Sequence, residues 1–116
     1  MWYDIKNFSK TGPEEISLEV QVPPDSNWFS GHFPGEPILP GIAQLGMVFD
    51  AINRAEGGSF KITGIRRVRF KQIVRPDDRL HLTIRPQKNG GGGYDFRIEV
   101  NAELACSGIM TVAPRP

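Results

Sequence analysis

The sequence predicts an α+β domain in which a curved antiparallel sheet of about five strands wraps around one central helix. Apolar and polar residues alternate along several short segments, which is typical of half-buried strands. Helical apolar spacing is found in one stretch, residues 40–56, and segments rich in Gly and Pro separate the patterns. A chain of 116 residues accommodates one such domain, over residues 1–116, and is too short for a second core.

The first predicted strand covers residues 15–22, where four apolar residues alternate with Ser17, Glu19 and Gln21 before two prolines end it. The next segment, residues 25–40, is predicted to be a loop because of its Gly and Pro content. The loop is long for a compact domain, and long ordered loops are often functional.

The predicted helix runs from Pro40-Gly41 to about Glu56. Apolar residues cover most of its circumference, so we expect it to be buried, with Gly57-Gly58 as its C-terminal cap. A sheet curled around the helix is the natural way to bury it. Because one thin sheet cannot enclose such a helix completely, its remaining side indicates a second copy of the domain.

Four further strands are predicted after the helix, each from apolar and polar alternation or from a short apolar run. They lie within residues 61–74, 80–84, 94–102 and 105–112. The last is apolar on both faces, as expected of a central strand. Arg75-Pro76-Asp77-Asp78 predicts a turn, and residues 89–93 predict a wide hairpin loop.

Composition and charge exclude several classes of protein. The chain is 39% hydrophobic and 23% charged, which is ordinary for a globular domain, and its net charge of +1 gives no reason to expect nucleic-acid binding. Cys106 is the single cysteine, so no internal disulfide is possible and a reducing, cytoplasmic location is expected. With His32 and His81 it makes too few ligands for a zinc site. We expect neither a signal peptide nor a membrane span, since no apolar run is long enough.

The chemically informative stretch is residues 31–42, in which three prolines stiffen a loop that carries His32 shortly before the helix. Gly41, in the first helical turn, leaves helix N–H groups open to a ligand. These groups and the helix dipole favour a carbonyl oxygen that becomes negative. A histidine base beside such a site suits removal of a proton α to a thioester. No metal or redox cofactor is implied.

The residues of this stretch form a long and unusual motif. They read Gly31-His32-Phe33-Pro34-Gly35-x-Pro37-x-x-Pro40-Gly41, followed by Gln44 and, later, by Val68-Arg69-Phe70-Lys71-x-x-Val74-x-Pro76-x-Asp78-x-Leu80. The pattern resembles the signature of the 3-hydroxyacyl-[acyl-carrier-protein] dehydratases, the FabA/FabZ group of hotdog-fold proteins. The resemblance implies a hotdog fold, a dimer, and a tunnel along the dimer interface for an acyl chain on phosphopantetheine. It also implies Phe33, Pro40, Gly41 and Gly46 as substrate-binding residues.

The resemblance implies two catalytic groups for dehydration of a 3-hydroxyacyl carrier-protein thioester in fatty acid or related acyl-chain biosynthesis. His32 would remove the C2 proton, and a Glu or Asp on the partner's central helix would protonate the leaving C3 hydroxyl. That carboxylate belongs about fourteen residues after His32, where this chain has Gly46. Loss of a general acid typically costs about 10²- to 10⁴-fold in rate.

Three interpretations of Gly46 stay open. Asp50, one helical turn further on, is a candidate acid whose pKa we expect burial in an apolar helix to raise. Alternatively, a related chain in a heterodimer supplies the acid. In the third interpretation the chain binds acyl groups without dehydrating them, and Gly46 serves close packing or a wider tunnel. A thioesterase on the same fold is a further alternative, which needs a carboxylate that activates water.

Arg67, Arg69 and Lys71 share one face of a predicted strand. Such a run is often only a solvated face. Because acyl carrier proteins are acidic, the resemblance implies that these three residues dock the carrier protein. Cys106 is predicted to be a buried packing residue, since no motif pairs it with a base.

Overall fold

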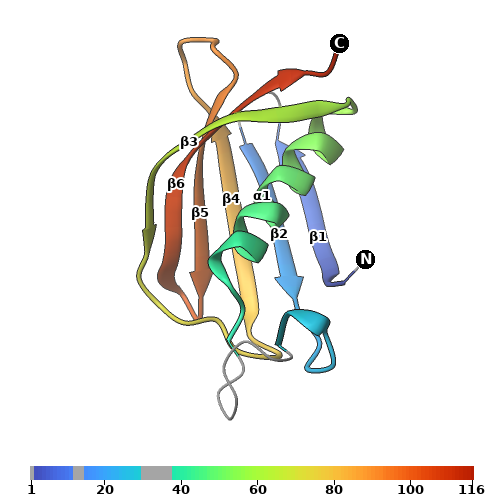
Figure 1. Cartoon of the computed structure of the whole chain (residues 1–116), viewed down its shortest axis with the longest axis vertical. Coiled ribbons are helices and arrows are strands. Elements are labelled where there is room, and N and C mark those ends of the chain that lie inside the picture. The colour runs from blue at the N-terminus through green and yellow to red at the C-terminus, as the bar shows by residue number, and fades with distance from the viewer. Residues whose placement is uncertain (1, 12–14, 30–37) are drawn as a thin grey trace.

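The structure, a computed structural model, describes residues 2–11, 15–29 and 38–116. Within these ranges a six-stranded antiparallel sheet curls around one long helix (Figure 1). The elements are β1 (Asp4–Thr11), β2 (Glu15–Gln21), the 3-10 turn η1 (Asn27–Phe29), α1 (Gly41–Glu56), β3 (Phe60–Phe70), β4 (Arg79–Pro86), β5 (Gly93–Val100) and β6 (Glu103–Pro114). The strand order is β1-β2-β4-β5-β6-β3. The predicted α+β class and its sheet around one helix are confirmed.

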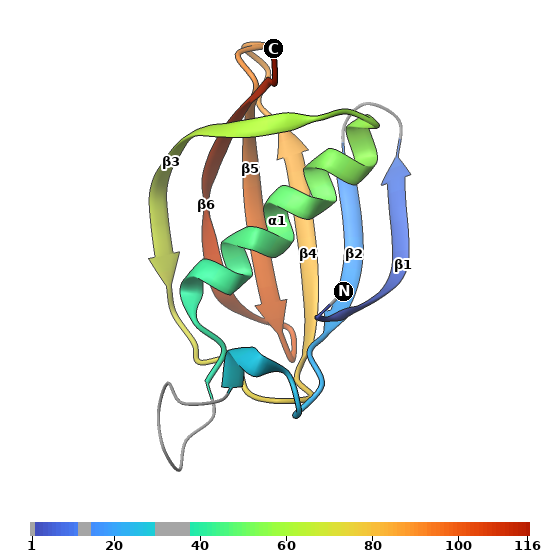
Figure 2. The ribbon, with the colours of Figure 1, turned by 45° about the vertical axis from the view of Figure 1, so that its right-hand side comes forward.

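Helix α1 crosses the concave side of the sheet (Figure 2). Apart from Gln44 its inward face is apolar, and Met47, Val48 and Ile52 are completely buried. Every second residue of the central strands points toward this face, because side chains alternate across a strand. The inward residues of β2, β4 and β5 are Ile16, Leu18, Val20, Leu80, Leu82, Ile84, Phe96 and Ile98. Together they form the core on which the helix rests.

The two ends of α1 differ in how they are capped. Gly57 has φ 62°, the left-handed conformation that glycine adopts at the end of a helix, which confirms the predicted C-terminal cap. Pro40 precedes the first turn with an extended backbone and supplies no side-chain cap. The Leu39 N–H donates to the Val74 carbonyl at 2.8 Å, which fixes the approach to the helix. The side chain before α1 therefore does not cap the N–H groups of the first helical turn.

Strand β1 is absent from the sequence prediction, which expected about five strands. Its side chains are mostly exposed, and its two half-buried apolar residues, Ile5 and Phe8, are three positions apart. Asn7 lies between them with φ 54°, where the pairing with β2 shifts register. This bulge breaks the period of two that reveals a strand in a sequence.

Strand β3 forms the edge of the sheet beyond β6 (Figure 1). It ends at Phe70, earlier than the predicted segment of residues 61–74. Arg67 has φ 56°, and the register against β6 shifts there. Ile62, Ile65 and Phe70 on this strand are 39% to 51% exposed. An edge strand with exposed apolar side chains is a natural place for another chain to pair.

The β5–β6 turn yields a stability prediction. Val100 pairs with Glu103, and the two residues between them, Asn101 and Ala102, have φ 53° and 64°. The left-handed region costs an alanine about 1–2 kcal/mol more than a glycine. We expect Ala102→Gly to raise the free energy of unfolding by about 0.5–1 kcal/mol, as measured by urea denaturation. Ala105→Gly, inside β6, is the control and should lower it.

Within the described residues, no helix has the length and apolar character needed to cross a membrane.

Candidate active site

Two predicted site residues, His32 and Phe33, belong to residues 30–37 and lie outside the described residues. The structure does describe the chain on both sides of that segment. Phe29 ends η1 and is 8% exposed, and Leu39 is 2% exposed and bonded to Val74. The described chain is thus in the core at Phe29, before that segment, and at Leu39, after it and just before the start of α1.

Gly41 begins α1 directly beneath an aromatic ring. A Cβ added at Gly41 would lie 2.5 Å from Cζ of Phe70 and 2.8 Å from Cε1 of the same ring. Only glycine therefore leaves this ring in its place. Phe70, Ile42 and Ile73 are 46% to 65% exposed. The helix start thus combines the N–H groups of a first turn with exposed apolar side chains, as a site for an acyl thioester requires.

Gly46 lies one turn further along α1 and borders open space. A Cβ added there would meet no atom within 4 Å. The absence of a side chain at Gly46 therefore serves no close packing within the single chain. Within the single chain, a Cβ at this position therefore displaces no neighbour.

Asp50 does not have the environment that the sequence predicts. Its side chain is exposed in the single chain, so the expected burial in an apolar helix is wrong. The Tyr3 hydroxyl donates a hydrogen bond to Asp50 Oδ2 at 2.7 Å. Tyr3 is 3% exposed, and its pKa is raised by burial first and by the neighbouring Asp50 carboxylate second. The carboxylate of Asp50 is thus bound to the N-terminal segment, a contact that no sequence pattern indicates.

The Tyr3–Asp50 pair yields a second stability prediction. We expect Tyr3→Phe and Asp50→Asn each to lower the free energy of unfolding by about 1–2 kcal/mol, because each removes one partner of a charge-assisted bond. The double variant should lose less than the sum of the two, as measured in a double-mutant cycle. If the losses of unfolding free energy in the two single variants add up in the double variant, the two side chains do not interact.

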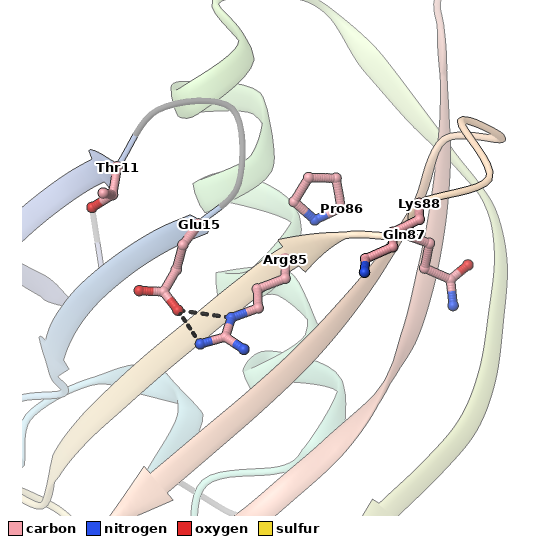
Figure 3. A pocket seen from close by; sticks show the side chains of 6 residues that line it. All are labelled: Thr11, Glu15, Arg85, Pro86, Gln87 and Lys88. Carbon is pink, nitrogen blue, oxygen red and sulfur yellow. Dashed lines mark hydrogen bonds and ion pairs between the residues drawn. The ribbon is translucent and has the colours of Figure 1, made fainter.

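A matched control for that cycle lies in the cleft of Figure 3, at the other end of the sheet from the helix start. The cleft is lined by Thr11, Glu15, Arg85, Pro86, Gln87 and Lys88. Arg85 Nη2 lies 2.7 Å from Glu15 Oε1, and the Arg85 side chain is 68% exposed. Because exposed ion pairs contribute little, Glu15→Gln should cost less than about 1 kcal/mol. The cleft has no histidine among its lining residues, and its one carboxylate is paired with Arg85.

Arg67, Arg69 and Lys71 line one groove, and Arg97 lines it with them. The strand face that the first three were predicted to share is interrupted by the register shift at Arg67, and Lys71 follows the end of β3. Arg69 and Arg97 both pair with Ser107 of β6, so they flank this serine across three strands. The groove holds one carboxylate, that of Asp95. The sequence does not indicate Arg97, because only the pairing of both β5 and β3 with β6 brings Arg97 to the same groove. We refer to Arg67, Arg69, Lys71 and Arg97 as the basic groove.

Two remaining residues with polar side chains, Cys106 and Gln44, are buried in the interior. Cys106 is completely buried, and burial raises the pKa of its thiol to about 11, which confirms a packing residue and argues against a nucleophile. Gln44 in the first turn of α1 is 2% exposed. In the sequence, Gln44 is distinguished only as part of a motif. Among the described residues, no group of three or more His, Cys, Asp or Glu is arranged to hold a metal.

A curved antiparallel sheet around one helix, with an uncapped glycine start to that helix, defines a hotdog-fold protein. The family model described as ApeI-like, ApeI dehydratase, matches residues 8–109. The chain belongs to this family of dehydratases.

Relatives and solved structures agree with this assignment. A 3-hydroxyacyl-[acyl-carrier-protein] dehydratase FabZ of Shewanella woodyi is 30% identical over 116 aligned residues, covering 90% of this chain and 76% of the relative. An uncharacterised protein from Erwinia carotovora subsp. atroseptica has a TM-score of 0.78 and 30% identity, covering 96% of this chain and 93% of that one. The dehydratase heterocomplex ApeI:P from Xenorhabdus doucetiae has a TM-score of 0.87 at 24% identity, covering 99% and 100% of the two chains. The last likeness confirms the hotdog fold.

Proposed function

We propose that this chain is a single-domain dehydratase subunit that converts a 3-hydroxyacyl thioester of acyl carrier protein into the enoyl thioester and water. The observation that carries the proposal is the His32 motif leading into the uncapped glycine start of α1, within a family of dehydratases. The FabZ relative bears the same reaction in its name. The free thiol of Cys106 fits work in a reducing cytoplasm, in fatty acid or related acyl-chain synthesis.

The proposed mechanism uses separate protein groups at the carbonyl, at C2 and at C3 of the acyl thioester. The N–H of Gly41 polarises the thioester carbonyl while His32 removes a proton from C2. The electron pair of that C–H bond forms the C2=C3 double bond as the C3–O bond breaks. The hydroxyl takes a proton from a general acid and leaves as water. Phe33, Pro40 and Gly46 would border the acyl chain.

The source of the acid has two candidates, and we favour a partner chain. Asp50 is already bonded to Tyr3, and Gly46 leaves the usual acid position vacant. A related chain pairing along the exposed edge of β3 could bring a carboxylate to His32. The similar chain from Xenorhabdus doucetiae belongs to a dehydratase heterocomplex, which supports such an arrangement. In a homodimer, Asp50 would have to fill this role.

One assay distinguishes the candidate functions. The purified chain, alone and with a related dehydratase chain, is incubated with a crotonyl or 3-hydroxydecanoyl carrier-protein thioester. Interconversion of hydroxyacyl and enoyl forms supports the dehydratase. Tight binding without turnover in either mixture identifies an acyl-binding subunit, and release of free thiol identifies a thioesterase. An unchanged rate in Asp50→Asn would exclude Asp50 as the acid.

We further propose that the basic groove docks the acidic carrier protein. We expect Arg69→Glu to raise KM for a carrier-linked substrate by about 5- to 30-fold with little change in kcat, because a charge pair becomes a repulsion. The KM for the same acyl group on free pantetheine should not change. Lys88→Glu, at the other end of the sheet, is the matched control. If Arg69→Glu and Lys88→Glu raise this KM equally, the docking surface lies elsewhere.

A further inference from the structure

Gln44 is 2% exposed, and apart from Tyr and Cys residues it is the one polar side chain that is buried within the described ranges. Its neighbours on the inward face of α1, such as Met47 and Val48, are apolar and completely buried. The Gln44 side-chain oxygen, Oε1, has no hydrogen-bond partner in the described chain. A buried acceptor without a partner lowers the stability of the fold, and an apolar side chain of the same size would avoid that loss. Such a group needs an explanation outside the packing of the core.

The position of Gln44 connects it with the proposed site. It lies in the first turn of α1, and its backbone N–H donates to the Pro40 carbonyl at 3.4 Å. Side chains on a helix lean toward its N-terminus and cover the preceding turn. The amide of Gln44 is therefore directed toward the turn that begins at Gly41. On the β3 side the ring of Phe70, which is about half exposed, covers this same turn.

The chemistry of the unpaired atom selects its ligand. An amide oxygen accepts hydrogen bonds and cannot donate them. The thioester carbonyl is also an acceptor, so the two cannot pair. In the reacting part of a 3-hydroxyacyl thioester, the hydrogen-bond donor is the C3 hydroxyl, which the enoyl product lacks.

We infer that Gln44 Oε1 accepts a hydrogen bond from the C3 hydroxyl of the substrate and thereby makes the site selective for 3-hydroxyacyl groups. This inference rests on the proposed function. It assigns Gln44 the recognition of the hydroxyl and leaves proton transfer to His32 and the acid. The bond would hold the hydroxyl hydrogen toward Gln44, so that a lone pair on the oxygen is free for the incoming proton.

The test compares the binding of two amide-linked pantetheine analogues, a 3-hydroxyacyl chain and the saturated acyl chain of the same length. Calorimetry on the wild-type protein should give about 5- to 10-fold tighter binding of the hydroxyacyl analogue. Gln44→Met, which keeps the volume, should abolish this preference. Its melting temperature should rise by roughly 4–10 °C, because the unpaired acceptor is gone. Gln72→Met removes a partially exposed amide that is bonded to Glu103 and should keep the preference.

The outcomes separate this inference from the proposed function. If the role of Gln44 is purely structural, Gln44→Met should lower the melting temperature and weaken the binding of both analogues alike. This result overturns the inference. A preference that persists in Gln44→Met overturns it as well. A wild-type protein that dehydrates its substrate yet binds both analogues equally overturns the inference alone. A wild-type protein that neither binds an analogue nor turns over a thioester overturns both proposals.

Discussion

Replacing Gly46 with glutamate is expected to raise the dehydration rate of the purified chain by about 10²- to 10⁴-fold, the usual contribution of a general acid. The space for the new side chain is present, because a Cβ at Gly46 meets no atom within 4 Å. The fold should tolerate the change, since glycine inside a helix is less favourable than glutamate by about 0.5–1 kcal/mol. The variant would place a carboxyl group where the resemblance to FabZ-type dehydratases locates the acid.

The matched control is Gly46→Gln, which has nearly the same shape and gains the same helix stability but carries no acidic proton. Rates of hydroxyacyl and enoyl interconversion are measured for both variants, after their oligomeric state and melting temperature have been compared. A rate gain confined to Gly46→Glu supports the vacant acid position. If both variants fold and remain as slow as the wild type, the missing carboxylate is not what limits the reaction.

His32→Ala is expected to lower kcat/KM by about 10²- to 10⁴-fold in whichever assembly is active, because it removes the proposed base. His81 provides the control, since it lies on β4 with its Nε2 3.3 Å from the exposed Ser17 hydroxyl. His81→Ala should leave the rate unchanged. Loss of activity in both variants would point to a general effect on folding.

The same substitution distinguishes the two proposed assemblies. In a heterodimer that unites His32 of this chain with a carboxylate of a related chain, His32→Ala should abolish the reaction of that composite site even when the partner is intact. If activity persists because the partner's own histidine performs the chemistry, this chain serves as a binding subunit. Where His32 and the partner's carboxylate form the active site, Gly46→Glu should add a second site, in which the new carboxyl group faces the partner's own histidine.

Elements with a strong local pattern were predictable from the sequence, and contacts that depend on register were not. The limits of α1 follow from apolar spacing and from Gly57, whose positive φ the structure confirms. Strand β1 was hidden by the bulge at Asn7. Arg97 joins the basic groove only through the pairing of β5 with β6.

The candidate site shows the same division. The motif around Gly41 was visible because its residue types are unusual, and the vacancy at Gly46 followed from counting along it. The predicted environment of Asp50 was wrong, because the apolar pattern of the helix does not indicate which distant segment of the chain lies beside it. Tyr3 is 47 residues away in sequence from the carboxylate that it contacts. No local pattern predicts such a contact.

The ring of Phe70 over Gly41 couples the start of α1 to the last residue of the edge strand β3. Positions 41 and 70 share one volume, so a methyl group added at 41 has to push the ring outward. The ring would then move toward the strand edge along which a partner chain is proposed to pair. Substitutions at the helix start would therefore affect subunit assembly as well as catalysis. In a mutational search the two positions should be varied as one site, because the best residue at each depends on the other.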